Sequence, residues 1–553
     1  MLDPIPGDRL VGSPSPFYQS KRLVLKRIVD YHFHRMKLYR GFATVAGITI
    51  ISRILGFARD VLIAAVLGTS YGADAFFVAF RVPNIFRRLF SEGSFEAAFI
   101  PLFAKRLQGD GPEQARAFAG EALSGLAFLL VGFTLLAEIA MPWLMLLLAP
   151  GFRTDPEKFD LAVTLARIAL PYLVFMSLVA LYSGILNAFG RYAIAAFAPT
   201  ILNMVLIAVL LALVAFGPPN QRVAVAALTW SIAASGVLQV LLVALAAARV
   251  GMRLPLRGPR LTPDMRRLAS LAAPGAMAGG LAQLTLVIST IIATIQDRVV
   301  SWLYYADHLV QLPVGVIGVA IGVVLLPELS HKLRSGDHEA VLASENRALE
   351  FALLLAMPAT VALFLAAEPI MRVLFERGAF TSIDTKAAAK MLAALALGLP
   401  AYVLIKVLHS SYFAREDTRT PMIYAAISMT VNTVLSLSLF LVVGATGIAI
   451  ATMLSSWLNV ALLVTTLTRH RVFRPDHTFR RCLTGILVAS AIMGVVVIAL
   501  VGSLDPWLLP SRGFAVQATA LLTLVLTGLL VYLGTAYLFG ATHFRNLIKS
   551  AGV

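Results

Sequence analysis

The sequence predicts an all-α polytopic membrane protein with about fourteen transmembrane helices. Two six-helix lobes are expected to repeat in parallel around a central cavity, followed by two further helices at the C-terminus. Three observations lead to this prediction: a very apolar composition, long uninterrupted apolar runs, and an internal repeat. Of the 553 residues, 59% are hydrophobic and 14% are charged, whereas a soluble chain usually carries about 25% charged residues.

The apolar residues form runs of about 20 or more, which is enough for a helix to cross a hydrocarbon core of about 30 Å. Helix is the expected spanning form, because each backbone amide must find its partner within its own segment. The expected spans are 42–66, 71–103, 118–148, 158–187, 195–216, 222–248, 268–294, 300–328, 348–370, 384–412, 420–442, 446–467, 483–502 and 514–540.

The chain repeats itself at a separation of about 227 residues. Pro142 and Gly151 correspond to Pro369 and Gly378, and each pair has an offset of 227. Six expected spans separate equivalent positions, and an even number preserves orientation, so the axis that relates the lobes runs along the membrane normal. The expected units are an N-terminal extension (1–35), a first lobe (36–260), a second lobe (261–470) and a C-terminal appendage (471–553).

The net charge of +17 is distributed unevenly. Alternate connections, beginning with the one after the second span, carry about twenty Lys and Arg residues, and the other seven carry about seven. The positive-inside rule places the basic side in the cytoplasm. Because the expected number of spans is even, both termini are expected in the cytoplasm, and the placement of the charge argues against a nucleic-acid partner.

The sequence carries no sign of a metal or cofactor site. Cys482 is the single cysteine, so a disulfide within one chain and a Cys/His metal cluster are both excluded. Residues 1–35 are polar and basic, without the apolar core of a signal peptide. The segment beginning at Met36 resembles a second start, and a chain that starts there is expected to be functional.

Charged residues concentrate in the first two expected spans, where charge is costly and usually functional. Arginines outnumber acids five to four in this region, which holds Arg53, Arg59, Asp60, Asp74, Arg81, Arg87, Arg88, Glu92 and Glu96. Arg81 and Arg88 could reach the headgroups by snorkelling. The other three arginines lie deeper and are expected to face a water-filled cavity.

Several arginines in one cavity indicate an anionic ligand, because the planar guanidinium matches phosphate oxygens in two-point contact. A diphosphate would engage two or three of them. Export of cationic drugs is disfavoured, since it would require acids to predominate. A membrane-embedded polyprenyl-phosphate transferase would need a carboxylate cluster for Mg²⁺, and no paired-Asp motif stands at a loop edge. We therefore expect a transporter, not an enzyme.

Several strings resemble the MurJ (MviN) family of lipid II flippases, from about residue 36 to the C-terminus. They are SRILGFARD (52–60), PNIFRRLFSEG (83–93), WLYYAD (302–307) and IKVLHSSYFARED (405–417). The larger group that includes this family also contains multidrug-and-toxin extrusion transporters and polysaccharide flippases. A flippase for another polyprenyl-diphosphate-linked oligosaccharide therefore remains open as an alternative.

The resemblance implies alternating access and a substrate, undecaprenyl-diphosphate-linked disaccharide-pentapeptide, that passes from the cytoplasmic to the periplasmic leaflet. Membrane lipids and cell-wall synthesis or division proteins are the other implied partners. The implied substrate-binding residues are Arg53, Arg59, Arg87 and Glu92, and the implied gate residues are Ser52, Asp60, Asp74 and Ser301. His308 stands where the family usually has arginine, and no acid between residues 268 and 294 matches a sodium ligand proposed in one branch.

Two expectations concern how these residues are arranged. The first is that Asp60 and Asp74 pair with Arg59 near the periplasmic end, because only the short segment GTSYG joins the first two spans. The second is that His308 binds the substrate diphosphate, with affinity that strengthens from about pH 8 to pH 6, where histidine titrates.

Overall fold

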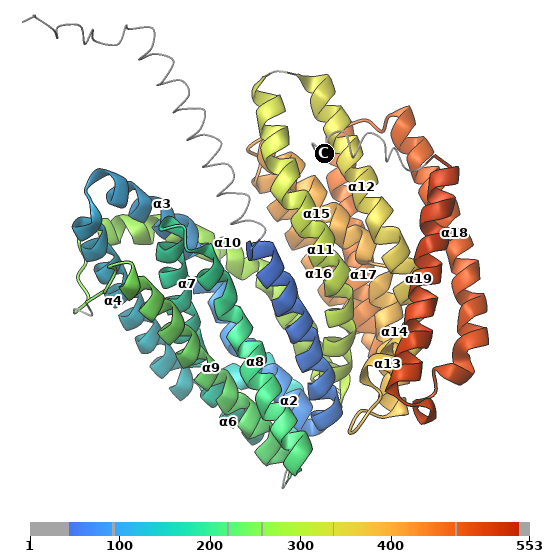
Figure 1. Ribbon diagram of the computed structural model, residues 1–553, viewed down its shortest axis with the longest axis horizontal. Coiled ribbons are helices and arrows are strands. Elements are labelled where there is room, and N and C mark those ends of the chain that lie inside the picture. The colour runs from blue at the N-terminus through green and yellow to red at the C-terminus, as the bar shows by residue number, and fades with distance from the viewer. Residues whose placement is uncertain are drawn as a thin grey trace, which may run out of the picture.

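The computed structural model describes residues 44–90, 94–217, 220–255, 258–335, 337–470 and 473–540, and all regular secondary structure in these ranges is helical. Figure 1 shows two groups of helices that approach each other at one end of the molecule and diverge towards the other. The expected all-α fold with two lobes is confirmed. Glu92 and the segment before residue 44, including Met36, lie outside the described residues.

The first lobe begins with a helix over residues 44–67. It continues with α2 (Tyr71–Phe90), α3 (Ser94–Gly109), α4 (Pro112–Ile139), α5 (Met141–Leu148), α6 (Pro156–Ala169), α7 (Tyr172–Ala188), α8 (Tyr192–Phe216) and α9 (Gln221–Arg249).

The second lobe comprises α10 (Pro263–Ala293), α11 (Val299–Arg334), α12 (His338–Leu365), α13 (Ala367–Phe375), α14 (Ser382–Ala396), α15 (Leu399–Ala414), α16 (Arg419–Val443) and α17 (Thr446–Arg469). The two remaining long helices, α18 (His477–Leu504) and α19 (Phe514–Leu538), pack against each other at the outer side of this lobe (Figure 1).

Ten helical segments in the described residues are long and apolar enough to cross a membrane. The total of fourteen spans stays a prediction. One span in each lobe is built from two helices, Pro156–Ala188 from α6 and α7, and Ser382–Ala414 from α14 and α15. Pro171 and Pro400 stand at these breaks, as expected for a residue that has no backbone donor and disrupts a continuing helix.

Helix boundaries repeat between the lobes as the sequence predicts. The offset is 226 between the starts of α4 and α12, of α5 and α13, and of α6 and α14. It is 227 between the starts of α7 and α15 and between those of α8 and α16. The two lobes are therefore copies of one helical plan.

The repeated glycines mark where each lobe meets the other. Gly151 lies against the Thr294 carbonyl oxygen, just past the end of α10, and its N–H donates to Thr294 Oγ1 over 3.3 Å. Gly378 lies against the Ala65 carbonyl oxygen, which also accepts from the N–H of Ala379 over 2.9 Å. A Cβ atom at either glycine would overlap that carbonyl oxygen.

Gly378→Ala is therefore expected to force the lobes apart at this junction and to lower the melting temperature of the purified protein. The clash is with backbone, which relaxes less easily than a flexible side chain. Gly444→Ala provides a comparison for conformational strain alone, because Gly444 also has a positive φ, of 69°, but an added Cβ atom would meet no other atom within 4 Å. Equal effects in the two variants would show that the lobe contact is unimportant.

Candidate functional site

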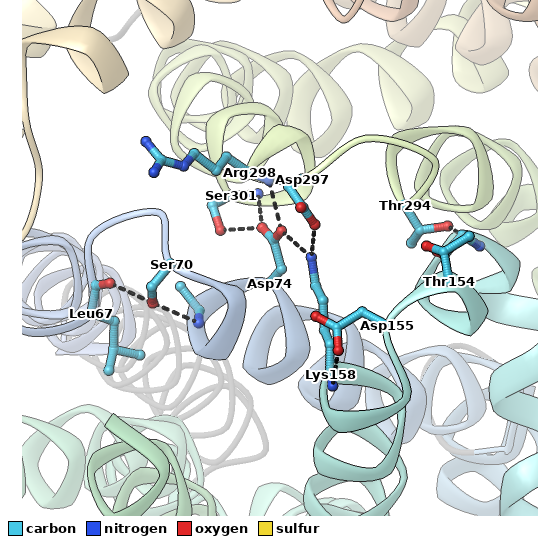
Figure 2. A network of polar contacts seen from close by, with 12 residues as sticks. Leu67, Ser70, Asp74, Thr154, Asp155, Lys158, Thr294, Asp297, Arg298 and Ser301 are labelled. Carbon is cyan, nitrogen blue, oxygen red and sulfur yellow. Dashed lines mark hydrogen bonds and ion pairs between the residues drawn. The ribbon is translucent and has the colours of Figure 1, made fainter. Parts of the chain in front are cut away.

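The convergent end of the two lobes is sealed by one buried carboxylate. Asp74, in the first turn of α2, is fully buried. It accepts three hydrogen bonds from the start of α11, namely from Arg298 N (2.8 Å), Ser301 N (3.1 Å) and Ser301 Oγ (2.6 Å). Figure 2 shows Asp74 pointing at this turn. A carboxylate of the first lobe thus caps the N-terminus of a helix in the second, where the helix dipole favours negative charge.

Lys158 supplies the positive charge of this network. Its side chain is fully buried at the start of α6, and Nζ lies 2.9 Å from Asp74 Oδ2 and 2.7 Å from Asp297 Oδ1 (Figure 2). Nζ also lies 4.4 Å from the centre of the Phe152 ring. Lys158 therefore joins a carboxylate of its own lobe to one of the other lobe.

A second contact mirrors the first across the repeat axis. Asp384, on α14, accepts from Thr69 Oγ1 of the first lobe over 2.5 Å and from Trp302 Nε1 over 3.1 Å. The Arg298 guanidinium lies 3.7 Å from the same carboxylate oxygen, Asp384 Oδ1. Helices α6 and α14 are repeat equivalents, so each lobe sends a charged side chain from this helix to the loop that follows the other lobe's first helix.

These positions correct one expected pairing and show that two of the expected gate residues are in contact. Asp74 does not pair with Arg59, because its carboxylate is occupied by α11 and Lys158. Asp60 does pair with Arg59. Asp74 and Ser301 lie in direct contact, and their offset of 227 makes them equivalent residues of the repeat.

A second cluster surrounds Asp60 in the middle of the first helix. Arg59 donates to Asp60 Oδ1 from Nε (3.0 Å) and from a terminal nitrogen (2.8 Å). Tyr304 donates to the same oxygen over 3.2 Å, and His308 Nε2 lies 2.9 Å from Asp60 Oδ2. The carboxylate is 1% exposed, so the first helix is held to α11 by a buried charge that three side chains surround.

Asn203, on α8, fixes the position of Arg59. Its Oδ1 accepts from Arg59 over 2.9 Å, and its Nδ2 donates to the Ser52 carbonyl oxygen over 3.0 Å. Ser52 thus takes part through its backbone. Asn203 has a repeat counterpart in Asn432, at an offset of 229, but repetition alone does not indicate its partner.

Arg53 lies apart from this cluster, on the side of the first helix that faces α11. It is exposed, and among the described residues it forms no ion pair. Within the same described part of the chain, it is the one charged residue that lines a groove of about 580 Å³. The groove runs between the first helix and α11, and its apolar lining includes Ile50, Ile54, Phe57, Leu312, Val316 and Leu355.

The three arginines of α2 differ in their contacts. Arg81 bonds to Thr290 Oγ1 on α10, so it links α2 to the second lobe. Arg87 is partly buried and donates to Asn84 Oδ1 over 3.4 Å on its own helix. Arg88, one residue further, is exposed.

Sequence reasoning missed Lys158, Asp384 and Tyr304. Lys158 stands between Glu157 and Asp160 at the start of a span, a pattern that is typical of a solvated helix end. Asp384 is the third residue of α14, where an acid is typical of a capping box with Thr381. Nothing local marks either residue as buried, because the partners Asp74, Asp297, Thr69 and Trp302 are far away along the chain.

Two pseudo-symmetric helical lobes, sealed at one end and carrying arginines in the first lobe's membrane helices, define a membrane transporter for an anionic substrate. Residues 63–514 match the protein family described as "Lipid II flippase MurJ". The chain belongs to the MurJ family of lipid II flippases.

Individual relatives agree with this assignment. The "Probable lipid II flippase MurJ" of Rhizobium tropici is 44% identical over 93% of this chain and 97% of its own length. The "Lipid II flippase MurJ" of Burkholderia cenocepacia is 35% identical over 83% of this chain and 89% of its own.

Solved structures show the same fold. A structure titled "Lipid II flippase MurJ, inward closed conformation" superposes with a TM-score of 0.72 at 27% identity, over 91% of this chain and 99% of that one. An inward-facing multidrug resistance transporter of the MATE family and MOP superfamily gives a TM-score of 0.64 at 13% identity, over 78% and 98% of the two chains. The second likeness concerns the fold alone.

Proposed function

We propose that this protein moves lipid II across the bacterial inner membrane for peptidoglycan synthesis, and that Arg53, Arg59 and Arg87 hold the substrate's diphosphate. The observation that carries this proposal is the exposed guanidinium of Arg53 at an otherwise apolar groove. A polyprenyl-diphosphate substrate has the matching chemistry, an apolar tail joined to a dianionic group. Glu92 is retained as a substrate-binding residue on the family resemblance alone.

The groove suggests how head and tail are separated. Apolar side chains from the first helix and α11 line it, so the polyprenyl chain would remain in contact with an apolar surface while the head enters between the lobes. Arg53 stands where these two environments meet. In this arrangement the polar head does not have to enter about 30 Å of hydrocarbon, where burying its polar groups without hydrogen bonds would be unfavourable.

The closed end of the molecule supports transport by alternating access. The connections at the other end are the basic ones, including those around Arg249, Arg415 and Arg469. The positive-inside rule assigns that end to the cytoplasm and assigns the seal formed by Asp74, Lys158 and Asp384 to the periplasmic side. Opening towards the periplasm would break the contacts of Asp74 with α11.

A disulfide across the seal is expected to block transport reversibly. In a chain with Cys482→Ala, the substitutions Ala65→Cys and Ala379→Cys place thiols on two residues that join the lobes at this end through a backbone hydrogen bond of 2.9 Å, and they leave the charged network intact. Oxidation should fix the periplasmic end closed and stop lipid II flipping in reconstituted vesicles, and reduction should restore any activity that the paired variant has. Each single-cysteine chain serves as a control. Flipping that continues at the same rate in the fully cross-linked chain would refute the gate.

His308 is proposed as a substrate ligand that Asp60 also contacts. Because Nε2 already lies 2.9 Å from Asp60, the diphosphate would compete with Asp60 for the same imidazolium. A diphosphate is attracted to the protonated ring only, so lipid II binding is expected to strengthen from pH 8 to pH 6. His308→Arg should bind with little dependence on pH, and His308→Gln weakly throughout. Parallel binding curves for all three chains would remove His308 from the site.

Complementation tests the proposed function as a whole. A bacterial strain depleted of its lipid II flippase should grow when it expresses this chain. The same strain should not grow when it expresses Arg53→Ala at an equal level in the membrane. If the wild-type chain instead rescues only a strain lacking a flippase for another polyprenyl-diphosphate-linked oligosaccharide, the substrate assignment is wrong and the alternative substrate is correct.

A further inference from the structure

Lys406 is a cation inside a membrane span that forms no ion pair among the described residues. It lies at the eighth position of α15, within the span Ser382–Ala414, and its side chain is exposed. Among the described residues no acid pairs with it, and Nζ makes one long hydrogen bond, 3.4 Å to the carbonyl oxygen of Val314. Charge without a counter-charge at this depth is costly and is usually retained for function.

Two glycines of α11 bring Lys406 near Arg53. Lys406 Nζ lies 2.5 Å from the position that a Cβ atom on Gly318 would occupy, and a terminal nitrogen of Arg53 lies against the corresponding position on Gly315. These glycines are three residues apart, which is about one helical turn. A cation from each lobe therefore rests on the same small-residue face of α11.

Among the described residues, no acid compensates the charge of Arg53 and Lys406. Asp307, the acid that precedes them on α11, lies two turns before Val314, a rise of about 10 Å, and it accepts a hydrogen bond from Gln311. Asp60 is surrounded by Arg59, Tyr304 and His308. Two like charges held close together without an acid favour a ligand that brings more than one negative charge.

We propose that Arg53 and Lys406 form a two-lobed anion site on the Gly315–Gly318 face of α11, and that it binds the diphosphate of a polyprenyl-diphosphate lipid. This inference rests on the proposed function and deepens it, because it assigns the second lobe a substrate ligand besides His308. The two cations repel each other across the lobe boundary when the site is empty. A bound diphosphate attracts both, so binding draws the lobes together around α11.

Diphosphate binding to the purified full-length protein tests this proposal. The probes are a short-chain polyprenyl diphosphate, the corresponding uncharged polyprenol, and inorganic diphosphate. We expect Lys406→Met to weaken binding of the polyprenyl diphosphate at least about tenfold, as for loss of one charge-assisted contact, and to leave polyprenol binding unchanged. Lys406→Arg should retain binding within a few fold. Lys390→Met, which removes an exposed lysine of α14, is the matched control and should have no effect.

Gly318→Ala supplies a variant that keeps every charge. The added methyl group would displace the Lys406 ammonium from its place on α11, and binding should weaken several fold. If inorganic diphosphate displaces the lipid probe, the headgroup alone is recognised. If it does not, the polyprenyl tail is also required. Either result supports the site only if Lys406→Met also weakens binding of the lipid probe.

Wild-type affinity in Lys406→Met, or in Gly318→Ala, would overturn the proposal, and so would a wild-type chain that binds no diphosphate. Failure of the wild-type chain to complement a flippase-depleted strain, with diphosphate binding intact and dependent on Lys406, would instead count against lipid II transport alone.

Discussion

Replacing Lys158 by methionine is expected to abolish transport and to destabilise the closed end of the protein. Lys158 and Asp74 are both fully buried and lie 2.9 Å apart. Removing one partner of a buried ion pair typically costs about 3–5 kcal/mol, because the remaining charge stays uncompensated. Complementation and the melting temperature of the purified chain measure the two effects.

Two further variants make this prediction specific. Asp297→Asn removes the other carboxylate that contacts Lys158. The Asp297 side chain is 83% exposed, so losing its charge should lower the free energy of unfolding by at most about 1 kcal/mol. Lys158→Met combined with Asp74→Asn removes both buried charges and leaves an amide oxygen that can still accept from α11, so stability should partly return. A Lys158→Met chain as stable as the wild type, beside an unstable Asp297→Asn chain, would show that the buried pair is not the seal.

Arg53→Ala is expected to abolish transport while leaving the protein folded, inserted and as stable as the wild type. Arg53 is exposed and pairs with no acid among the described residues, so the fold does not depend on its charge. Losing a charge-assisted contact of about 1.5–3 kcal/mol should weaken diphosphate binding about ten- to hundredfold. Arg53→Lys should rescue poorly, because lysine is a point charge and lacks the guanidinium fork.

Arg59→Ala provides the contrast, because Arg59 is committed to Asp60 and Asn203. Its removal should lower both activity and melting temperature, since it leaves a carboxylate that is 1% exposed without its cation. Equal losses of stability in Arg53→Ala and Arg59→Ala would show that Arg53 has a structural role that its surroundings do not reveal.

The architecture could be predicted because a helical membrane fold depends on features that can be read directly along the sequence. Long apolar runs predicted the helices, and the equal spacing of Pro142 and Gly151 from Pro369 and Gly378 predicted the two lobes. The structure adds a reason for the glycine spacing, since each glycine lies against the backbone at the end of the opposite lobe's first helix. The charge density of the first two spans likewise predicts where the substrate site lies, and that location stays a prediction.

The partners of those charges could not be predicted in the same way. Sequence proximity favoured Asp74 beside Arg59, but the Asp74 carboxylate faces the start of α11, more than 220 residues away along the chain. Lys158 is an ordinary residue locally, at the charged start of a span. Lys406 lies inside the expected span 384–412, but nothing in the sequence indicates that it lies near Arg53. Their positions follow from how the lobes pack, and a local pattern cannot encode contacts between copies of a repeat.

Flipping of lipid II in vesicles reconstituted with the purified chain tests the central claim most directly. Lipid II is incorporated in the membrane, and its appearance on the opposite leaflet is followed over time. The wild-type chain should move it, and Arg53→Ala, incorporated at the same density and equally stable, should move it no faster than protein-free vesicles. Transport at the wild-type rate by the Arg53→Ala chain would contradict the claim that exposed arginine at an apolar groove carries the diphosphate.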